Sequence, residues 1–320
     1  MALAVKVKTA LDETRTLILG AQILLGFQCQ GAFRPQFDSL PGLSRRLSAV
    51  ALVLMLLSIG LLVAPSAFHR IAEGGQSTGR MPRLTGAFAG IALLPFAIAL
   101  GLDLTLTLGR AWGRPVAGAT AGTLLAIAAI IGWYGAGLYM RRTQGTRERV
   151  QAIADWAQRD PGPLHARIEH MLTEARVILP GAQALLGFQL VIVLSNAFER
   201  LPSSSRAIHG FALIAVALAT VLLITPAALH RIVWAGEESE AFLRLGGRIT
   251  VLALLPLAFG MTGDTYVVLA RTIGTMSSAI AAGVSLLFLL GLWLGIPLVG
   301  RTLWQPQRIA AKTGQPANRS

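Results

Sequence analysis

The chain has 320 residues, of which 54% are hydrophobic and 13% are charged, and its mean hydropathy is +0.62. The apolar residues form runs too long for the core of a soluble domain, which excludes the two-domain soluble protein that the length alone would suggest. The formal net charge of +13 does not indicate nucleic-acid binding, because Arg and Lys lie almost wholly between the apolar runs, where they orient helices and meet anionic lipid headgroups.

The chain contains the same unit twice. Residues 20–28 read GAQILLGFQ and residues 181–189 read GAQALLGFQ, an offset of 161. When 13–110 is aligned with 174–271, 37 of the 98 positions are identical without a gap. This pattern indicates a tandem duplication. We therefore expect a first unit at 1–140, a linker at 141–163, a second unit at 164–300 and a basic tail at 301–320.

The apolar runs predict an all-α protein with eight transmembrane helices, four in each unit. An amphipathic lead-in at 3–18, repeated at 164–172, is expected to lie at the membrane surface. Polar segments rich in Gly and Pro at 34–42 and 72–82 are expected turns or loops. The expected helices span 16–33, 47–68, 84–108 and 116–140, and then 177–196, 207–229, 245–269 and 274–300.

Glycines along the fourth helix predict a close approach to a neighbouring helix. They are Gly118, Gly122, Gly132, Gly135 and Gly137.

The distribution of basic residues predicts the orientation. The N-terminus, the loops after the second, fourth and sixth helices and the C-terminus hold 20 of the 28 Lys and Arg residues, and the other four loops hold 8. By the positive-inside rule, both termini are expected in the cytoplasm. Because each unit has an even number of helices, both units insert the same way up. The expected relation is a pseudo-twofold axis along the membrane normal.

Polar residues inside the apolar runs form three pairs at the 161-residue offset, and for each pair a structural and a functional interpretation stay open. Buried glutamines either hydrogen-bond between helices or line a solute path. The acids are either structural or interfacial groups near the outer end of a helix, or an ion or proton site. The histidines cap a helix C-terminus, relay protons, or bind a metal or haem, the last disfavoured because no second His pair follows. The pairs are Gln22 and Gln183, Asp103 and Asp264, and His69 and His230.

Further charges lie at the expected membrane boundaries: Glu13, Arg15, Glu174, Arg176, Arg70 and Arg231. The Glu and Arg of each E-x-R motif are two positions apart and do not face each other on a helix. They are either ordinary boundary anchors or partners of another helix. Three histidines without a counterpart in the other unit receive no role: His165, His170 and His209.

No HExxH, CxxC, GxSxG or Walker-type string occurs, and the single Cys29 cannot form an intramolecular disulfide. We therefore expect no catalytic residue, no metal site and no cofactor. Three functions stay open: a small permease or channel-like transporter, a non-catalytic scaffold or sensor that binds protein partners, and, least favoured, an intramembrane redox subunit. The expected partners are the bilayer, its anionic headgroups, and a membrane protein or a second copy of the chain.

The motif E-x-R-(x4)-G-x-Q-x-L-x-G-F, followed by P-x-A-x-H-R, occurs once in each unit. It resembles an uncharacterised family of bacterial four-helix membrane proteins, a domain of unknown function. The resemblance implies a four-helix unit and a location in the bacterial inner membrane, and it implies no activity. A single-unit relative is expected to dimerise, so the fusion would place that dimer on one chain.

Overall fold

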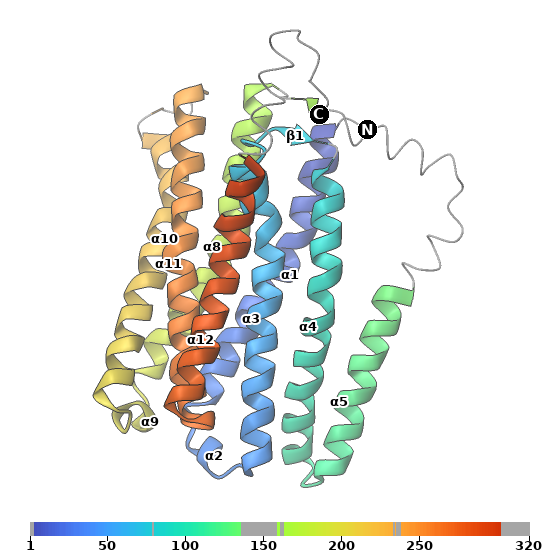
Figure 1. The fold of residues 1–320 in the computed structure, drawn as a ribbon, viewed down its shortest axis with the longest axis vertical. Helices are drawn as coiled ribbons and strands as arrows, with labels where there is room; N and C mark the ends of the chain where they lie inside the picture. Colours follow the sequence, from blue (N-terminus) through green and yellow to red (C-terminus); the bar gives the residue numbers. More distant parts are fainter. Residues whose placement is uncertain are drawn as a thin grey trace, which may run out of the picture.

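The computed structural model describes residues 3–78, 80–135, 159–160, 163–232, 234 and 238–301. Long helices stand side by side along the long axis of the molecule (Figure 1). The chain enters at the end where α1 begins, and the helix that finishes at Arg301 returns to that same end (Figure 1). We call this the terminal end, and the opposite end, which carries the short helices α2 and α9, the hairpin end.

In the first unit, α1 (Leu3–Gly31) leads through the one-turn α2 (Pro35–Asp38) to α3 (Gly42–Ile71). The next helix, α4 (Met81–Ala111), is followed by α5 (Pro115–Ile130), which continues as the π-helical η1 (Ile131–Gly135). Gly113, in the turn between α4 and α5, has a φ of 61°, a conformation that favours glycine. Proline at the start of α5 suits the first helical turn, where its missing N–H is not needed.

The second unit repeats this order. The long α8 (Leu164–Ile192) leads through α9 (Asn196–Glu199) to α10 (Ser203–Ile232) and α11 (Glu240–Ile273). Gly274, with a φ of 85°, separates α11 from α12 (Thr275–Leu290). The last helix continues through η2 (Gly291–Gly295) to residue 301. Side chains of Ser195 and Ser239 cap α9 and α11 by accepting a hydrogen bond from a backbone N–H.

The predicted loop at 72–82 also contains a two-residue strand, β1 (Ser77–Thr78). It pairs antiparallel with β2 (Arg159–Asp160), which lies in the predicted linker. The remainder of that linker, apart from residue 163, and the expected tail beyond residue 301 lie outside the described residues.

Seven helices within the described ranges are long and apolar enough to cross a membrane. The eighth expected span, the first in the chain, has a shorter apolar part, Leu17–Gly31, because charged Arg15 precedes it and three glutamines interrupt it. The protein is therefore an all-α membrane protein with multiple apolar helices. The seven are α3, α4, Pro115–Tyr134, α8, α10, α11 and Thr275–Arg301.

The predicted lead-in is not a separate surface helix in the second unit, because it forms the first turns of α8. No residue that breaks a helix lies between 164 and 177, so the backbone hydrogen bonds continue. The apolar stripe of this part is buried, since Ile168 and Met171 pack with Phe242 and Leu243 of α11. The corresponding part of α1 is helical as well.

The two units meet along α1 and α8, which pack side by side (Figure 1). Gly26 permits this approach, because a Cβ there would lie 1.9 Å from the ring of Phe188. The ring centroid of Phe27 lies 4.7 Å from that of Phe188. Gly187, the counterpart of Gly26, has no heavy atom within 4 Å of the position of a Cβ, so this contact is one-sided.

Helix α12 of the second unit also packs on α3 of the first. Trp293, fully buried in η2, donates a hydrogen bond from Nε1 to the carbonyl oxygen of Gly60 at 2.8 Å. A Cβ on Gly60 would lie 2.7 Å from Leu289 of α12. In the first unit, η1 (IGWYG) carries Trp133 at the position where η2 (GLWLG) carries Trp293, because these last helices align at an offset of 160. Gly60 corresponds to Val221 at the offset of 161. The helix that leads to Trp133, α5, packs on α4 (Figure 1), and the ring centroid of Trp133 lies 6.2 Å from that of Phe96.

The prediction that glycines allow a close approach is confirmed for Gly118 and Gly122. A Cβ on Gly122 would lie 2.2 Å from the carbonyl oxygen of Gly101 in α4, and one on Gly118 would lie 2.3 Å from the backbone of Gly109. Gly132 faces open space, Gly135 is the last residue of η1, and Gly137 lies outside the described residues.

Candidate functional site

A buried ionic cluster joins the two units near the terminal end. Oε1 of Glu174, on α8, lies 2.5 Å from Nδ1 of His69, on α3. Its Oε2 accepts a hydrogen bond from Nε of Arg70 at 2.7 Å. Glu174 is 1% exposed and His69 is 0% exposed, so the carboxylate and its partners are removed from solvent. A buried charge of this kind is stable only with its counterion.

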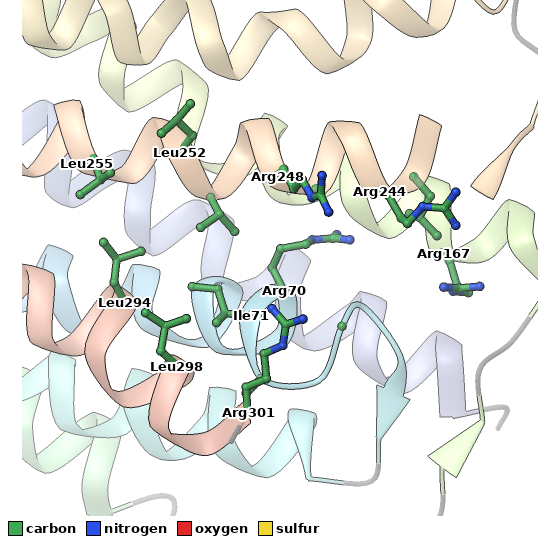
Figure 2. Close-up of a pocket in the computed structure, with 15 residues that line it drawn as sticks. Arg70, Ile71, Arg167, Arg244, Arg248, Leu252, Leu255, Leu294, Leu298 and Arg301 are labelled. Carbon is green, nitrogen blue, oxygen red and sulfur yellow. The ribbon is translucent and has the colours of Figure 1, made fainter. Parts of the chain in front are cut away.

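Two imidazole nitrogens around this cluster have no hydrogen-bond partner among the described residues: Nε2 of His69 and Nδ1 of His170. The two imidazole rings lie edge to face with centroids 6.3 Å apart. Arg70 Nη2 lies 2.5 Å from Glu174 Oε2, yet it is not aligned for a hydrogen bond. The cluster therefore has unused donor and acceptor capacity, and Arg70 also lines an open pocket (Figure 2).

The repeat counterpart of this cluster has a different environment. His230 is half-buried, and its ring stacks on that of Phe242 with a centroid distance of 4.7 Å. Arg231 is exposed, as are Arg15 and Arg176. The side chain of Glu13, the counterpart of Glu174, lies outside the part of the structure that is described.

Toward the hairpin end, each unit pairs an amide with a carboxylate. In the first unit, Gln28 Nε2 donates to Asp103 Oδ2 at 2.8 Å, and in the second, Gln189 Nε2 donates to Asp264 Oδ2 at 2.5 Å. Asp103 is half-buried and Asp264 is 3% exposed. The two pairs occupy equivalent positions, because both glutamines end the GFQ motif.

His209 adds a third group to the second pair. Its Nδ1 lies 2.9 Å from Oδ1 of Asp264, and its Nε2 lies 3.2 Å from the carbonyl oxygen of Gln189. The first unit has Ser48 at the equivalent position. The more deeply buried carboxylate therefore has one more polar partner than its counterpart.

Gln22 and Gln183 do not occupy equivalent environments. Gln22 is 1% exposed between α1 and α8, and a Cβ on Gly181 would lie 1.4 Å from its Oε1. Its amide makes no hydrogen bond to any described residue. Gln183 is exposed on the outer surface, so the interior position expected for both amides applies to Gln22 alone.

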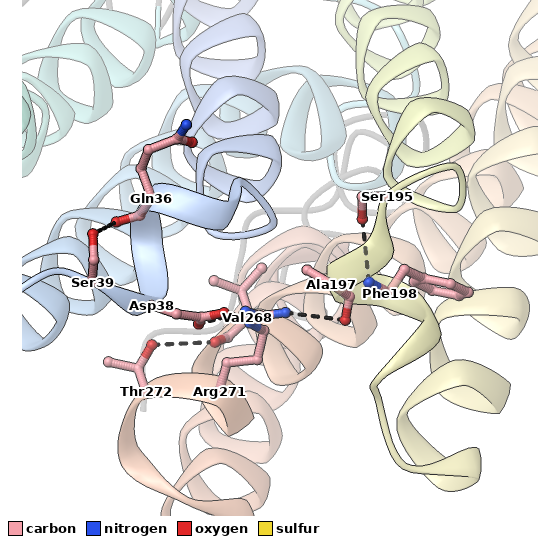
Figure 3. A network of polar contacts seen from close by, with 9 residues as sticks. All are labelled: Gln36, Asp38, Ser39, Ser195, Ala197, Phe198, Val268, Arg271 and Thr272. Atoms are coloured by element: carbon pink, nitrogen blue, oxygen red, sulfur yellow. Dashed lines mark hydrogen bonds and ion pairs between the residues drawn. The ribbon is translucent and has the colours of Figure 1, made fainter.

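At the hairpin end, Arg271 connects the units (Figure 3). Its Nη2 lies 2.7 Å from Oδ1 of Asp38, and its Nη1 donates to the carbonyl oxygen of Ala197 at 3.3 Å. The guanidinium carbon lies 5.2 Å from the centroid of the Phe33 ring. Asp38 is exposed, so this ion pair is a surface contact that positions α2 against α9 and α11.

Among the described residues, buried polar groups lie at both ends of the bundle. Within the described ranges, no group of three or more His, Cys, Asp and Glu side chains is placed to hold a metal ion. Cys29 is a buried free thiol. What the polar groups can do is bind an ion or exchange protons at either end of the bundle.

Sequence reasoning classed Glu174 among the boundary charges and missed Gln28, Gln189, His170 and His209. The signal for the glutamines was present, because each follows Gly-Phe in both copies and lies near the same end of the membrane as the duplicated aspartates. The duplication does not single out His209, because Ser48 stands at the equivalent position of the first unit.

The sequence model of a family of unknown function (DUF6328) matches the chain twice, over residues 4–136 and 164–297. No curated protein and no solved structure matches the chain. The two matches coincide with the two units described above and cover most of the chain. The protein belongs to this family of unknown function (DUF6328) and carries its domain as a tandem duplication.

Proposed function

We propose that the protein is a small permease or channel-like transporter in which ions or small solutes pass along the interface between the two units. The observation that carries this proposal is the buried cluster of His69, Arg70 and Glu174, to which both units contribute. Ionisable side chains inside a membrane protein are costly and usually mark an ion path or proton relay. A structural contact between the units would not require three ionisable groups with unused polar atoms.

The surroundings of the cluster support a path from the terminal end. A pocket of about 520 Å³ opens beside Arg70. A second, much smaller cavity of about 10 Å³ shares Arg70 with this pocket and is also lined by Glu174. At the other end of the bundle, Asp264 with His209 and Gln189 supplies a second buried polar site. Transport would require the apolar segment between the two sites to open transiently.

For the membrane arrangement, we propose eight spans, with both termini on the cytoplasmic side of a bacterial inner membrane and the two units related by a pseudo-twofold axis along its normal. The distribution of Lys and Arg, 20 against 8, supports this orientation. The first described helix begins, and the last one finishes, at the same end of the molecule (Figure 1), as an even number of spans requires. The symmetry is approximate, because the contacts of Gly26 and Trp293 each occur on one side only among the described residues.

The orientation predicts the reactivity of single introduced cysteines. A cysteine at Gln76, in the loop after α3, should react with a membrane-impermeant thiol reagent only from the cytoplasmic side. One at Ser204, in the exposed first turn of α10, should react only from outside. Cys29 is 2% exposed and should stay silent. Reaction of both cysteines from one side would contradict the eight-span arrangement.

Transport itself is tested with the full chain reconstituted into vesicles that contain a pH-sensitive dye. After a pH gradient is imposed, with chloride or phosphate as the anion, protein-containing vesicles should dissipate the gradient faster than protein-free vesicles. His69→Gln should slow this flux. His230→Gln is the matched control, because its ring stacks on Phe242 and makes no ion pair with a described residue, and it should leave the flux unchanged.

Thermal melting of each variant in detergent confirms that it is folded before its flux is compared. If the folded wild type moves neither protons nor either anion, transport is contradicted, and the scaffold or sensor function is favoured. If His69→Gln and His230→Gln reduce the flux equally, the path does not run through the buried cluster.

A further inference from the structure

The pocket of about 520 Å³ lies at the terminal end, where parts of both units meet. Its lining comes from the end of α3, the start of α8, the first half of α11 and the last helical turns before residue 301 (Figure 2). It is open to the surroundings and carries two chemically different walls.

The first wall is basic. Five arginines line the pocket: Arg70, Arg167, Arg244, Arg248 and Arg301. Two of them have acidic partners, since Arg70 contacts Glu174 and Arg167 contacts Glu240. The other three are exposed and make no ion pair with any described acid. Figure 2 shows the guanidinium groups gathered on one side of the pocket. Positive charge concentrated in this way attracts anions and offers guanidinium groups that bind phosphate.

The second wall is apolar. Leu252 and Leu255 of α11 face Leu294 and Leu298 of the last helix, on the side of the pocket away from the arginines (Figure 2). Leu252 and Leu298 are each 50% exposed. This wall lies farther from the terminal end than the basic one, because Leu252 and Leu255 follow Arg244 and Arg248 along α11. An inorganic anion would satisfy the arginines and leave these leucines uncovered.

We propose that the pocket binds an anionic phospholipid, with its phosphate between Arg244, Arg248 and Arg301 and an acyl chain along the leucines. In the orientation proposed above, the pocket lies on the cytoplasmic side of the membrane. Basic pockets between helices on that side of membrane proteins bind anionic headgroups in this way. Arg70 also lines the pocket, but its guanidinium is paired with Glu174 and its side chain is only 7% exposed, so the phosphate contacts are assigned to the other three arginines. The arginine pair of α11 is not repeated in α4, where Arg83 corresponds to Arg244 but Ala87 corresponds to Arg248.

The test compares lipid binding by matched arginine variants of the full-length protein. The protein is purified in detergent, stripped of lipid and titrated with phosphatidylglycerol, and bound lipid is counted by native mass spectrometry. The variant R244Q/R248Q should bind this lipid at least roughly tenfold more weakly than the wild type, as expected for two arginine–phosphate contacts. The control R110Q/R114Q removes two exposed arginines, also four positions apart, at the hairpin end, and should bind like the wild type.

Two further arms separate a lipid from a free anion. Phosphatidylcholine, which has no net charge, should bind weakly to every variant. The variant L252S/L298S should weaken binding of phosphatidylglycerol and leave binding of inorganic phosphate unchanged. Melting curves establish that each variant is folded.

Two outcomes would overturn the proposal. If R110Q/R114Q weakens binding as much as R244Q/R248Q does, the lipid is held by surface charge in general. If inorganic phosphate displaces the lipid completely at millimolar concentration, or binds as tightly as the lipid, the site belongs to a soluble anion.

Discussion

Glu174→Gln is expected to lower the free energy of unfolding by about 3–5 kcal/mol, the usual cost of removing one partner from a buried ion pair. Glutamine has the shape of glutamate but no charge, so the Arg70 guanidinium, 7% exposed, would be left without its counterion. His69 would lose the acceptor that lies 2.5 Å from its Nδ1. The measurement is a denaturation curve in detergent micelles.

Glu240→Gln provides the control. It also removes a carboxylate that pairs with an arginine, Arg167, yet the side chain of Glu240 is 48% exposed. Pairs in contact with solvent contribute only about 0–1 kcal/mol. If the two variants melted alike, the charge of Arg70 would have to be compensated by water or by lipid, and the cluster would not join the units.

Gly181→Ala is expected to destabilise the protein by about 1–3 kcal/mol, the cost of overfilling a packed core. The added Cβ would lie 1.4 Å from Oε1 and 2.7 Å from Cβ of Gln22. Rotation of the glutamine side chain relieves the first contact but not the second, so α1 and α8 must separate. Thermal melting and unfolding curves in detergent measure the change.

The matched control is Gly20→Ala at the first residue of the other GAQ motif. No heavy atom lies within 4 Å of a Cβ built there, and alanine is the better helix former by up to about 1 kcal/mol. Gly20→Ala should therefore leave the stability unchanged or raise it. Equal losses in both variants would mean that the units pack symmetrically along these two helices.

Much of the fold could be predicted from the sequence, because long apolar runs and the repeat at an offset of 161 are properties of the chain itself. The order of the helices follows from them. The lead-in was misjudged because its polar residues suggested a surface helix, whereas in α8 its apolar stripe meets Phe242 and Leu243.

The candidate site was only partly predictable, because a repeat in the sequence does not specify how two copies pack. Glu174 is paired by residues of the other unit, 104 and 105 positions away, and nothing in its own segment indicates this. The duplication predicts equivalent environments for Gln22 and Gln183, but Gln22 is buried and Gln183 is exposed. Gln28 and Asp103 lie 75 positions apart. Their contact could have been predicted by comparing how far each residue lies from the end of its expected helix.

The hydrogen bond from Trp293 to Gly60 bears on the descent of the chain. A homodimer of one ancestral domain must place the same residue at both equivalent positions, so each contact occurs twice or not at all. In the fused chain, both units keep the tryptophan, as Trp133 and Trp293, but the first unit alone keeps the small residue, because Val221 stands where Gly60 does. Two copies of the first unit would carry both the glycine and a tryptophan, whereas two copies of the second would carry a valine in place of the glycine. The two halves have diverged at this contact and are no longer interchangeable.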